Sequence, residues 1–176
     1  MAKRSNVREV LLAVILATGG ISGLPAFAQV NNDPVVIEGP GGPWKIESAN
    51  RAGDVRVAQV LGRDAMMLRA GTHVVFAGGG LEDGEMTFDL APLDDGDFVG
   101  VMFHRESFRN HENLYLRLSR SGEFMALQYA PRTNGSSTWQ LYPQFTAKTA
   151  WPRNQWTTVR IAIDGAQLSV FIGNKS

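Results

Sequence analysis

Hydrophobic and polar residues alternate along much of the chain. The alternation is clearest over residues 55–60, 86–90, 114–118, 159–163 and 168–172. Because successive side chains of a strand point to opposite faces of a sheet, a period of two predicts half-buried β-strands. No segment shows the 3.6-residue period of an amphipathic helix. Short strands at spacings of about 8–12 residues are typical of a β-sandwich or a β-barrel. Of these we expect an all-β, two-sheet antiparallel β-sandwich.

Glycine-containing pairs separate several of the predicted strands. Ser121-Gly122 and Asp164-Gly165 each lie between two strands, where they predict tight hairpin turns. Residues 29–43 are rich in Pro, Gly and Asn, so we expect a flexible lead-in there, with at most a short strand at Val35–Ile37. Residues 44–176 then form a single domain.

Residues 1–28 have the three parts of a secretory leader. Lys3 and Arg4 supply a positive start, residues 10–17 are an unbroken apolar run, and Pro25 precedes the small-residue pattern at 26–28. The apolar run is shorter than the roughly 20 residues that span a bilayer. The sequence therefore predicts cleavage after Ala28, a periplasmic or extracellular location, and no membrane insertion after cleavage.

Charge and cysteine content limit the classes of partner. The chain has 17 basic and 17 acidic residues, and it has no cysteine. Disulfides and a lipid-modified cysteine are therefore excluded. The sequence contains no basic patch of the kind that predicts nucleic-acid binding. A neutral partner such as a carbohydrate or polysaccharide agrees with this balance, although the balance alone does not imply one, and the oligomeric state stays open.

Alternate positions between residues 104 and 142 carry aromatic, amide and guanidinium groups on one predicted face. These residues are His104, Arg105, Asn113, Tyr115, Arg117, Gln128, Gln140 and Tyr142. Aromatic rings stack on the apolar face of a sugar, and the other groups hydrogen-bond its hydroxyls. An ordinary solvated face with cross-strand pairs explains the same pattern.

The segment FVGVMFHRES…NHENLYLRLSRSGEFMALQYAPRTNGSSTWQLYP, residues 98–142, resembles the concanavalin A-like lectin/glucanase superfamily. It is most similar to laminin-G-like domains associated with bacterial 3-keto-disaccharide hydrolases. The matching pieces are residues 103–105, 112–117, 128–131, 134–135 and 139–142. A later strand pair, from Trp156 to Ile172, also resembles the superfamily. The likeness covers about residues 44–176.

The resemblance implies a jelly roll that recognises a glycan on one sheet face. We expect Tyr115 and Trp139 to stack on the sugar. We expect its hydroxyls to hydrogen-bond with Arg105, Arg117, Gln128, Asn134 and Gln140. Trp139 as a buried residue is an equally simple interpretation, and Trp156, at the start of a strand, is expected in the core. Members of the superfamily continue with further strands, which implies a domain truncated at Ser176 or closed by earlier residues.

Two alternatives to a non-catalytic glycan-binding domain stay open. The first is a glycoside hydrolase that uses Glu85, Asp89 or Glu112. Glu85 and Asp89 share a strand face, but at about 3.3 Å per residue their Cα atoms lie roughly 13 Å apart, farther than the 5–5.5 Å or so between the carboxyls of a retaining enzyme. The second alternative is a laminin-G-like protein-interaction domain.

A structural calcium ion is a further expectation. Asp94, Asp95 and Asp97 supply carboxylates around a glycine turn, which suits this hard cation, although a polar turn explains the loop equally well. We expect no other cofactor. The three histidines show no shared zinc-ligand spacing.

Overall fold

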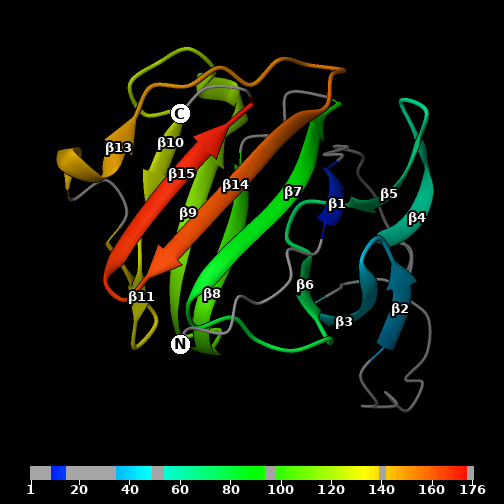
Figure 1. Cartoon of the computed structure of the whole chain (residues 1–176), viewed down its shortest axis with the longest axis horizontal. Coiled ribbons are helices and arrows are strands. Elements are labelled where there is room, and N and C mark those ends of the chain that lie inside the picture. The colour runs from blue at the N-terminus through cyan, green and yellow to red at the C-terminus, as the bar shows by residue number, and fades with distance from the viewer. Residues whose placement is uncertain (1–8, 15–34, 49–53, 94–97, 139–141, 174–176) are drawn as a thin grey trace, which may run out of the picture.

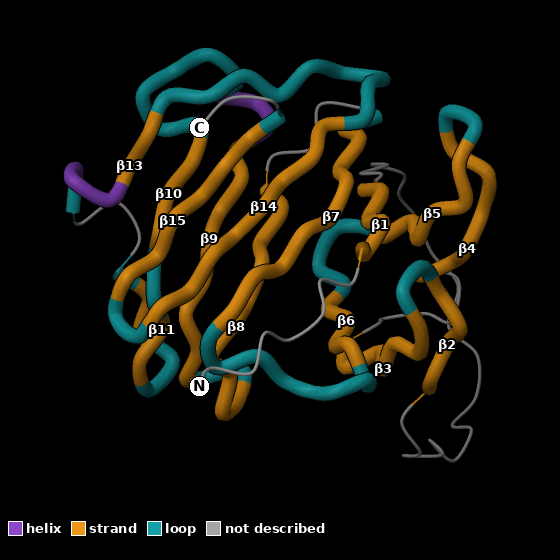
Figure 2. The backbone as a smooth tube through the Cα atoms, viewed as in Figure 1, coloured by secondary structure: helices purple, strands orange, loops and turns teal. Residues whose placement is uncertain are grey.

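The protein is built from β-strands, as the alternation predicts. The computed structural model describes residues 9–14, 35–48, 54–93, 98–138 and 142–173. Within these ranges there are two short 3-10 helices, η1 (Leu118–Arg120) and η2 (Pro143–Phe145), and the other elements are strands (Figures 1 and 2). The all-β prediction is confirmed. None of the helices in the described part is long and apolar enough to cross a membrane.

The strands occupy most of the described chain, and all five segments of clear alternation fall on them, with Leu118 just beyond the end of its strand. In chain order they are β1 (Glu9–Val14), β2 (Val35–Gly39), β3 (Gly42–Ser48), β4 (Val55–Val60), β5 (Arg63–Leu68), β6 (His73–Phe76), β7 (Gly84–Pro92), β8 (Phe98–Ser107), β9 (Asn110–Arg117), β10 (Leu127–Tyr129), β11 (Arg132–Thr133), β12 (Ser136–Ser137), β13 (Thr146–Ala147), β14 (Thr157–Asp164) and β15 (Gln167–Ile172).

These strands form three sheets. The first has the order β15-β14-β7-β1-β5-β4, and the third has the order β2-β3-β6. The second has the order β12-β11-β9-β10-β13, with β8 also paired to β9. Neighbours are antiparallel except at β1, which runs parallel to both β5 and β7. The structure therefore contains a third small sheet and a parallel strand that the predicted two-sheet antiparallel pattern does not include.

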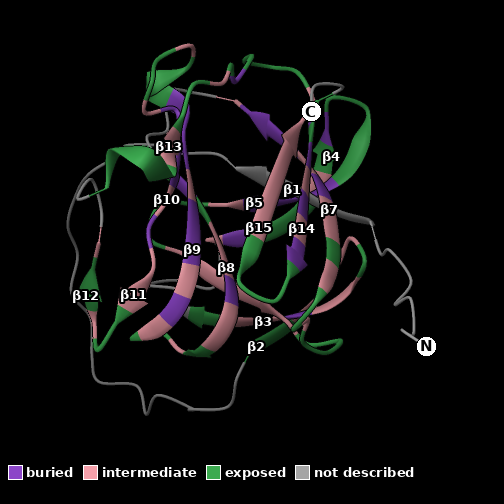
Figure 3. Cartoon of the chain, turned by 60° about the vertical axis from the view of Figure 1, so that its left-hand side comes forward, coloured by how far each residue is buried: buried purple, intermediate pink, exposed green. Residues whose placement is uncertain are grey.

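The main core lies between the first and second sheets (Figure 3). Its buried residues come from β7 and β14 on one side and from β8, β9 and β10 on the other, with Trp151 from the segment before β14. Trp151 is 2% exposed, and its Nε1 donates a hydrogen bond to the Ala126 carbonyl at 2.9 Å. Two smaller apolar clusters surround Trp44 of β3 and Val60, Ala65 and Met67 of β4 and β5.

One of the two predicted hairpin turns is confirmed and the other is wrong. Asp164 pairs with Gln167, so Gly165, with φ +54°, begins a two-residue loop between β14 and β15. The connection from β9 to β10 is longer than a tight turn, because η1 and a further loop follow Arg117. Ser121 Oγ in that loop instead accepts a hydrogen bond from the Trp151 amide at 2.7 Å.

A bulge in β8 places the residues of the candidate site. The pairing of β8 with β9 is regular from Phe98 to Phe103, and it resumes only at Ser107. Three residues of β8 therefore face a shorter stretch of β9. His104, the first of the three, has φ +43°, which side chains other than glycine rarely adopt. The bulge therefore breaks the strand alternation at this histidine.

Candidate functional site

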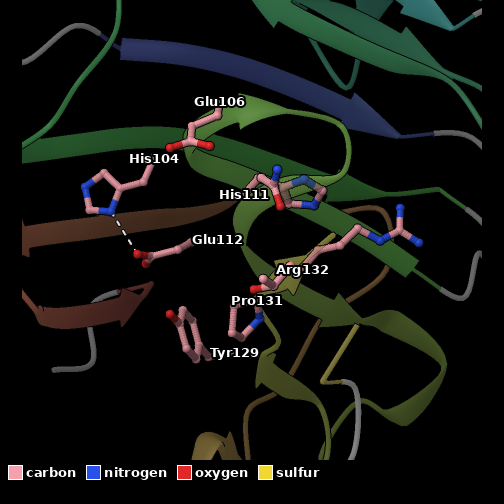
Figure 4. Close-up of a pocket in the computed structure, with 9 residues that line it drawn as sticks. His104, Glu106, His111, Glu112, Tyr129, Pro131 and Arg132 are labelled. Carbon is pink, nitrogen blue, oxygen red and sulfur yellow. Dashed lines mark hydrogen bonds and ion pairs between the residues drawn. The ribbon is translucent and has the colours of Figure 1, made fainter. Parts of the chain in front are cut away.

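A pocket of about 340 Å³ lies where β8, β9, β10 and β11 meet (Figure 4). Its volume falls at the small end of the range for ligand pockets, roughly 300–1,000 Å³. The lining residues are mostly polar: His104, Glu106, Asn110, His111, Glu112, Tyr129, Pro131, Arg132 and Thr133. The residues come from the β8 bulge, the first half of β9 and the segment from the end of β10 through β11.

His104 and Glu112 form an ion pair on one side of the pocket (Figure 4). The His104 Nδ1 lies 3.0 Å from Glu112 Oε1, and its Nε2 lies 2.7 Å from the Glu82 carbonyl oxygen. The hydrogen bond with Glu112, followed by that with the Glu82 backbone, raises the pKa of His104 above its ordinary 6.5. Both ring nitrogens face oxygen acceptors, so the protonated ring satisfies both contacts.

Tyr129 lies beside this pair. Burial, followed by the charge of Glu112 and a hydrogen bond with its carboxylate, raises the pKa of Tyr129 to about 12. The phenol is therefore protonated at neutral pH and can donate. The ring also makes an edge contact with Phe145, with ring centroids 5.5 Å apart. Glu112 is thus in contact with two hydrogen-bonding neighbours, His104 and Tyr129.

Two residues that line the pocket, Arg132 and His111, contact an aromatic cluster beside it. The Arg132 guanidinium points away from Glu112 and lies 4.9 Å from the Phe108 ring centroid (Figure 4). The Phe108 ring also contacts His111 of β9 and His73 of β6, at centroid separations of 5.9 and 4.7 Å. This cluster therefore links the small third sheet to the pocket.

Both histidines of this cluster favour the neutral form. Burial lowers the pKa of His73 and the pKa of His111 below 6.5, and the nearby guanidinium groups of Arg105 and Arg132 act in the same direction. The Glu47 carboxylate opposes the shift at His73, and hydrogen bonds to backbone carbonyls oppose it at His111. The pocket thus has one histidine whose pKa is raised and one whose pKa is lowered.

The predicted ligand residues Tyr115, Arg117 and Gln128 share one sheet face. Tyr115 pairs directly with Gln128, and Arg117 lies two residues along β9. Arg117 is 8% exposed and Gln128 is 1% exposed, so this face is largely covered. The Phe98 ring contacts both the Tyr115 ring, at 6.2 Å, and the Arg117 guanidinium, at 5.3 Å.

The other predicted ligand residues lie elsewhere. Arg105 is in the β8 bulge, where its guanidinium is paired with Glu47 of β3. Asn134 is at the turn between β11 and β12, where its backbone is held by Asn110 and Arg109. Trp139 and Gln140 lie outside the described residues. Trp156 precedes β14 and packs, partly buried, on the cluster around Ala65. The predicted ligand set stays a prediction.

The acids considered for catalysis divide into two groups. Glu85 is paired with Arg160 at 2.6 Å, and Asp89 accepts from Arg63 and Thr158, each at 2.6 Å. Both acids lie on β7, their partners lie on β14 and β5, and neither acid lines the pocket. Glu112, in contrast, lines the pocket.

The predicted calcium ligands Asp94, Asp95 and Asp97 lie outside the described residues. The part of the chain that the structure describes contains no group of three or more acidic or histidine residues that could hold a metal.

Sequence reasoning missed several residues that line the pocket. Glu106, Asn110, Arg132 and Thr133 belong to no motif, and the β8 bulge that contains Glu106 has no signature in the alternation. Their common signal is position, because all four lie between residues 104 and 142, the segment on which the sugar-face hypothesis rests.

Comparisons with known proteins give no match for this chain. No protein-family model matches the chain, and neither the curated proteins nor the solved structures contain a match. The chemistry of the residues that line the pocket is therefore the basis for a proposed function.

Proposed function

We propose that this protein is an exported, concanavalin A-like jelly-roll domain that binds a glycan in the pocket around Glu112. The observation that supports it is the composition of that pocket, where Tyr129, Glu106, Glu112, Asn110 and Arg132 line a small, open hollow. Sugars present both hydroxyls and an apolar ring face, so they need hydrogen-bonding groups and an aromatic surface together.

The roles of the lining residues follow from their contacts. Glu112 is held by His104 and Tyr129, so it is fixed as an acceptor for sugar hydroxyls. Arg132 is oriented by its stacking on Phe108 and supplies planar donors. Glu106 is exposed at the rim, where it provides a second acceptor. Fixed side chains lose little conformational entropy when a ligand binds.

Glycan binding is tested with an array screen followed by calorimetry on the best ligand. Arg132→Ala and Glu106→Gln are expected to weaken binding at least tenfold without loss of fold. Arg120→Ala is the matched control, because Arg120 pairs with Glu123 in the loop at the opposite end of β9. Equal affinity of wild type and both pocket variants would contradict the proposed site, and no glycan bound at all would contradict the function.

A glycoside hydrolase is the second candidate, because Glu106 and Glu112 line one pocket. Such an enzyme needs one protonated and one charged carboxyl group. Glu112, which contacts His104 and Tyr129, and Glu106, which is exposed at the rim, are the two carboxyl groups available for these roles. Release of a reducing or 3-keto sugar that is lost in Glu112→Gln would support the enzyme. Binding without turnover by wild type supports the non-catalytic domain.

A further inference from the structure

The first sheet contains a gap one strand wide between β5 and β7, and β1 occupies it (Figure 1). β1 pairs with β7 from Glu9 to Val14, and with β5 from Leu12 to Val14. Among the described strands, β5 otherwise pairs with β4 and β7 with β14. Since neighbouring strands lie about 4.8 Å apart, the facing edges of β5 and β7 are about 10 Å apart.

Contacts that do not involve β1 hold the two edges at this separation. Arg63 at the start of β5 donates to Asp89 of β7 at 2.6 Å, and its guanidinium lies 5.4 Å from the Trp156 ring centroid. Trp156 in turn donates to the Leu61 carbonyl at 3.4 Å. Leu93 and Trp156 also pack on the buried cluster of β4 and β5. The gap is therefore maintained by the strands on either side of it.

The occupant of this gap belongs to the predicted leader. Cleavage after Ala28 would separate residues 9–14 from the domain. The backbone N–H and C=O groups along the facing edges of β5 and β7 would then lose their partners. Unpaired strand edges readily add a strand from another segment or chain.

The residues beside the gap define what can enter it. Met66 and Met67 of β5, and Leu90 and Ala91 of β7, are between 0% and 7% exposed with the strand in place. Because consecutive residues of a strand point to opposite faces, these buried residues show that the sheet is covered on both faces beside the gap. A strand buried on both faces needs a nearly continuous apolar run, and a charge within it would be costly. Residues 10–14, VLLAV, have this composition.

We propose that the gap between β5 and β7 is a strand-acceptor site that, once the leader is removed, binds an extended apolar segment of a partner polypeptide. The segment contains an apolar run of about five residues, like residues 10–14, and runs parallel to both edges. Backbone hydrogen bonds to β5 and β7 provide affinity, and the absence of charge provides selectivity. This site is separate from the glycan pocket, which is formed by the second sheet, so either function can fail without the other.

The test uses the full chain with a specific protease site inserted after Ala28. The cut chain is incubated with a labelled peptide of residues 8–15, and the label that co-migrates with it is measured. We expect uptake by the cut chain, little uptake by the uncut chain, and no uptake of the peptide with Leu12→Pro, which lacks a ladder hydrogen bond. Hydrogen exchange should show new protection in β5 and β7.

Three outcomes would overturn the strand-acceptor site. They are no uptake by the cut chain, equal uptake by cut and uncut chains, and equal uptake of the native and proline peptides. If cutting unfolds the chain, the native peptide is expected to restore the melting transition. Failure of the peptide to restore it would also count against the proposal.

Discussion

His104 Nδ1, in the bulge of β8, lies 3.0 Å from Glu112 Oε1 on the neighbouring strand β9. The second ring nitrogen of His104 lies 2.7 Å from the Glu82 carbonyl, just before β7 begins. The imidazolium ring therefore joins the chain before β7 to the pocket wall. This contact accounts for the positive φ of His104, because the unusual backbone aims the ring at both acceptors.

The His104–Glu112 pair is predicted to stabilise the fold most at mildly acidic pH. The pKa of His104 is raised in the folded state above the 6.5 of the unfolded chain. Its contribution is therefore complete below pH 6.5, and it is lost as the pH rises through the raised value. His104→Gln should cost about 1 kcal/mol at pH 5.5–6, since the pair is partly exposed, and less at pH 9.

Urea unfolding of wild type and His104→Gln across this pH range measures the effect. The variant comparison removes the titration of all other groups, which the two proteins share. A stability difference that grows with rising pH would contradict the assigned protonation.

The contribution of His73 and His111 to stability is predicted to have the opposite pH dependence. Burial lowers the pKa of each ring, so their contribution to stability is present above pH 6.5 and is lost as the pH falls through the lowered values. Protonation would place two new charges beside Arg105 and Arg132, with Glu47 as the carboxylate that faces His73. Acidification should therefore loosen the third sheet from the pocket.

Hydrogen exchange of β3 and β6 between pH 7.5 and 5 tests this prediction. Protection should fall in wild type at acid pH, and a His73→Gln, His111→Gln double variant should show a flatter pH dependence. Unchanged protection of β6 in wild type down to pH 5 would count against it.

Gly100 and Asn113 are predicted to be energetically coupled. A Cβ added at Gly100 would lie 2.9 Å from Asn113 Oδ1, and Asn113 is 5% exposed, so its amide has little room to move. Gly100→Ala should destabilise the protein by about 1–2 kcal/mol, the usual cost of overpacking. A double-mutant cycle with Asn113→Ala should show that the second change relieves the clash. Strict additivity in that cycle would show that the predicted clash does not occur.

The core between the first two sheets is predicted to dominate stability. Ile161 of β14 is fully buried in it, whereas Phe124 is 58% exposed. Ile161→Ala should cost about 2–5 kcal/mol, and Phe124→Ala should change stability by no more than about 0.5 kcal/mol. Chemical denaturation of the two variants checks this. Comparable losses in the free energy of unfolding would contradict the placement of the main core around Ile161.

The sequence predicts the strands better than it predicts the site. The period of two in residues 159–163 and 168–172 survives as the β14–β15 hairpin, because local alternation is enough to define paired strands. The predicted sugar face brings Tyr115 and Gln128 together, because neighbouring antiparallel strands place opposite residues side by side. Alternation cannot show that the same face is largely covered, as Gln128 is at 1% exposure.

The pocket depends on contacts between segments that are distant in sequence. His104 meets Glu82, 22 residues earlier, and Glu112 meets Tyr129 from the next strand. The bulge that permits these contacts follows from packing of the whole sheet and not from a local turn signal. Arg105 departs from the predicted face for the same reason, because the bulge turns it toward Glu47 of the third sheet.

The central claim, that a glycan binds beside Glu112, is tested most directly by chemical-shift mapping with the best array ligand. We expect saturable chemical-shift changes at the backbone amides of four residues that line the pocket, and smaller changes at Tyr115 and Gln128. The four are Asn110, His111, Glu112 and Thr133. Arg132→Ala should abolish the shifts while Arg120→Ala preserves them. Chemical-shift changes centred on Tyr115 and Gln128, with the amides of the pocket unchanged, would contradict glycan binding beside Glu112.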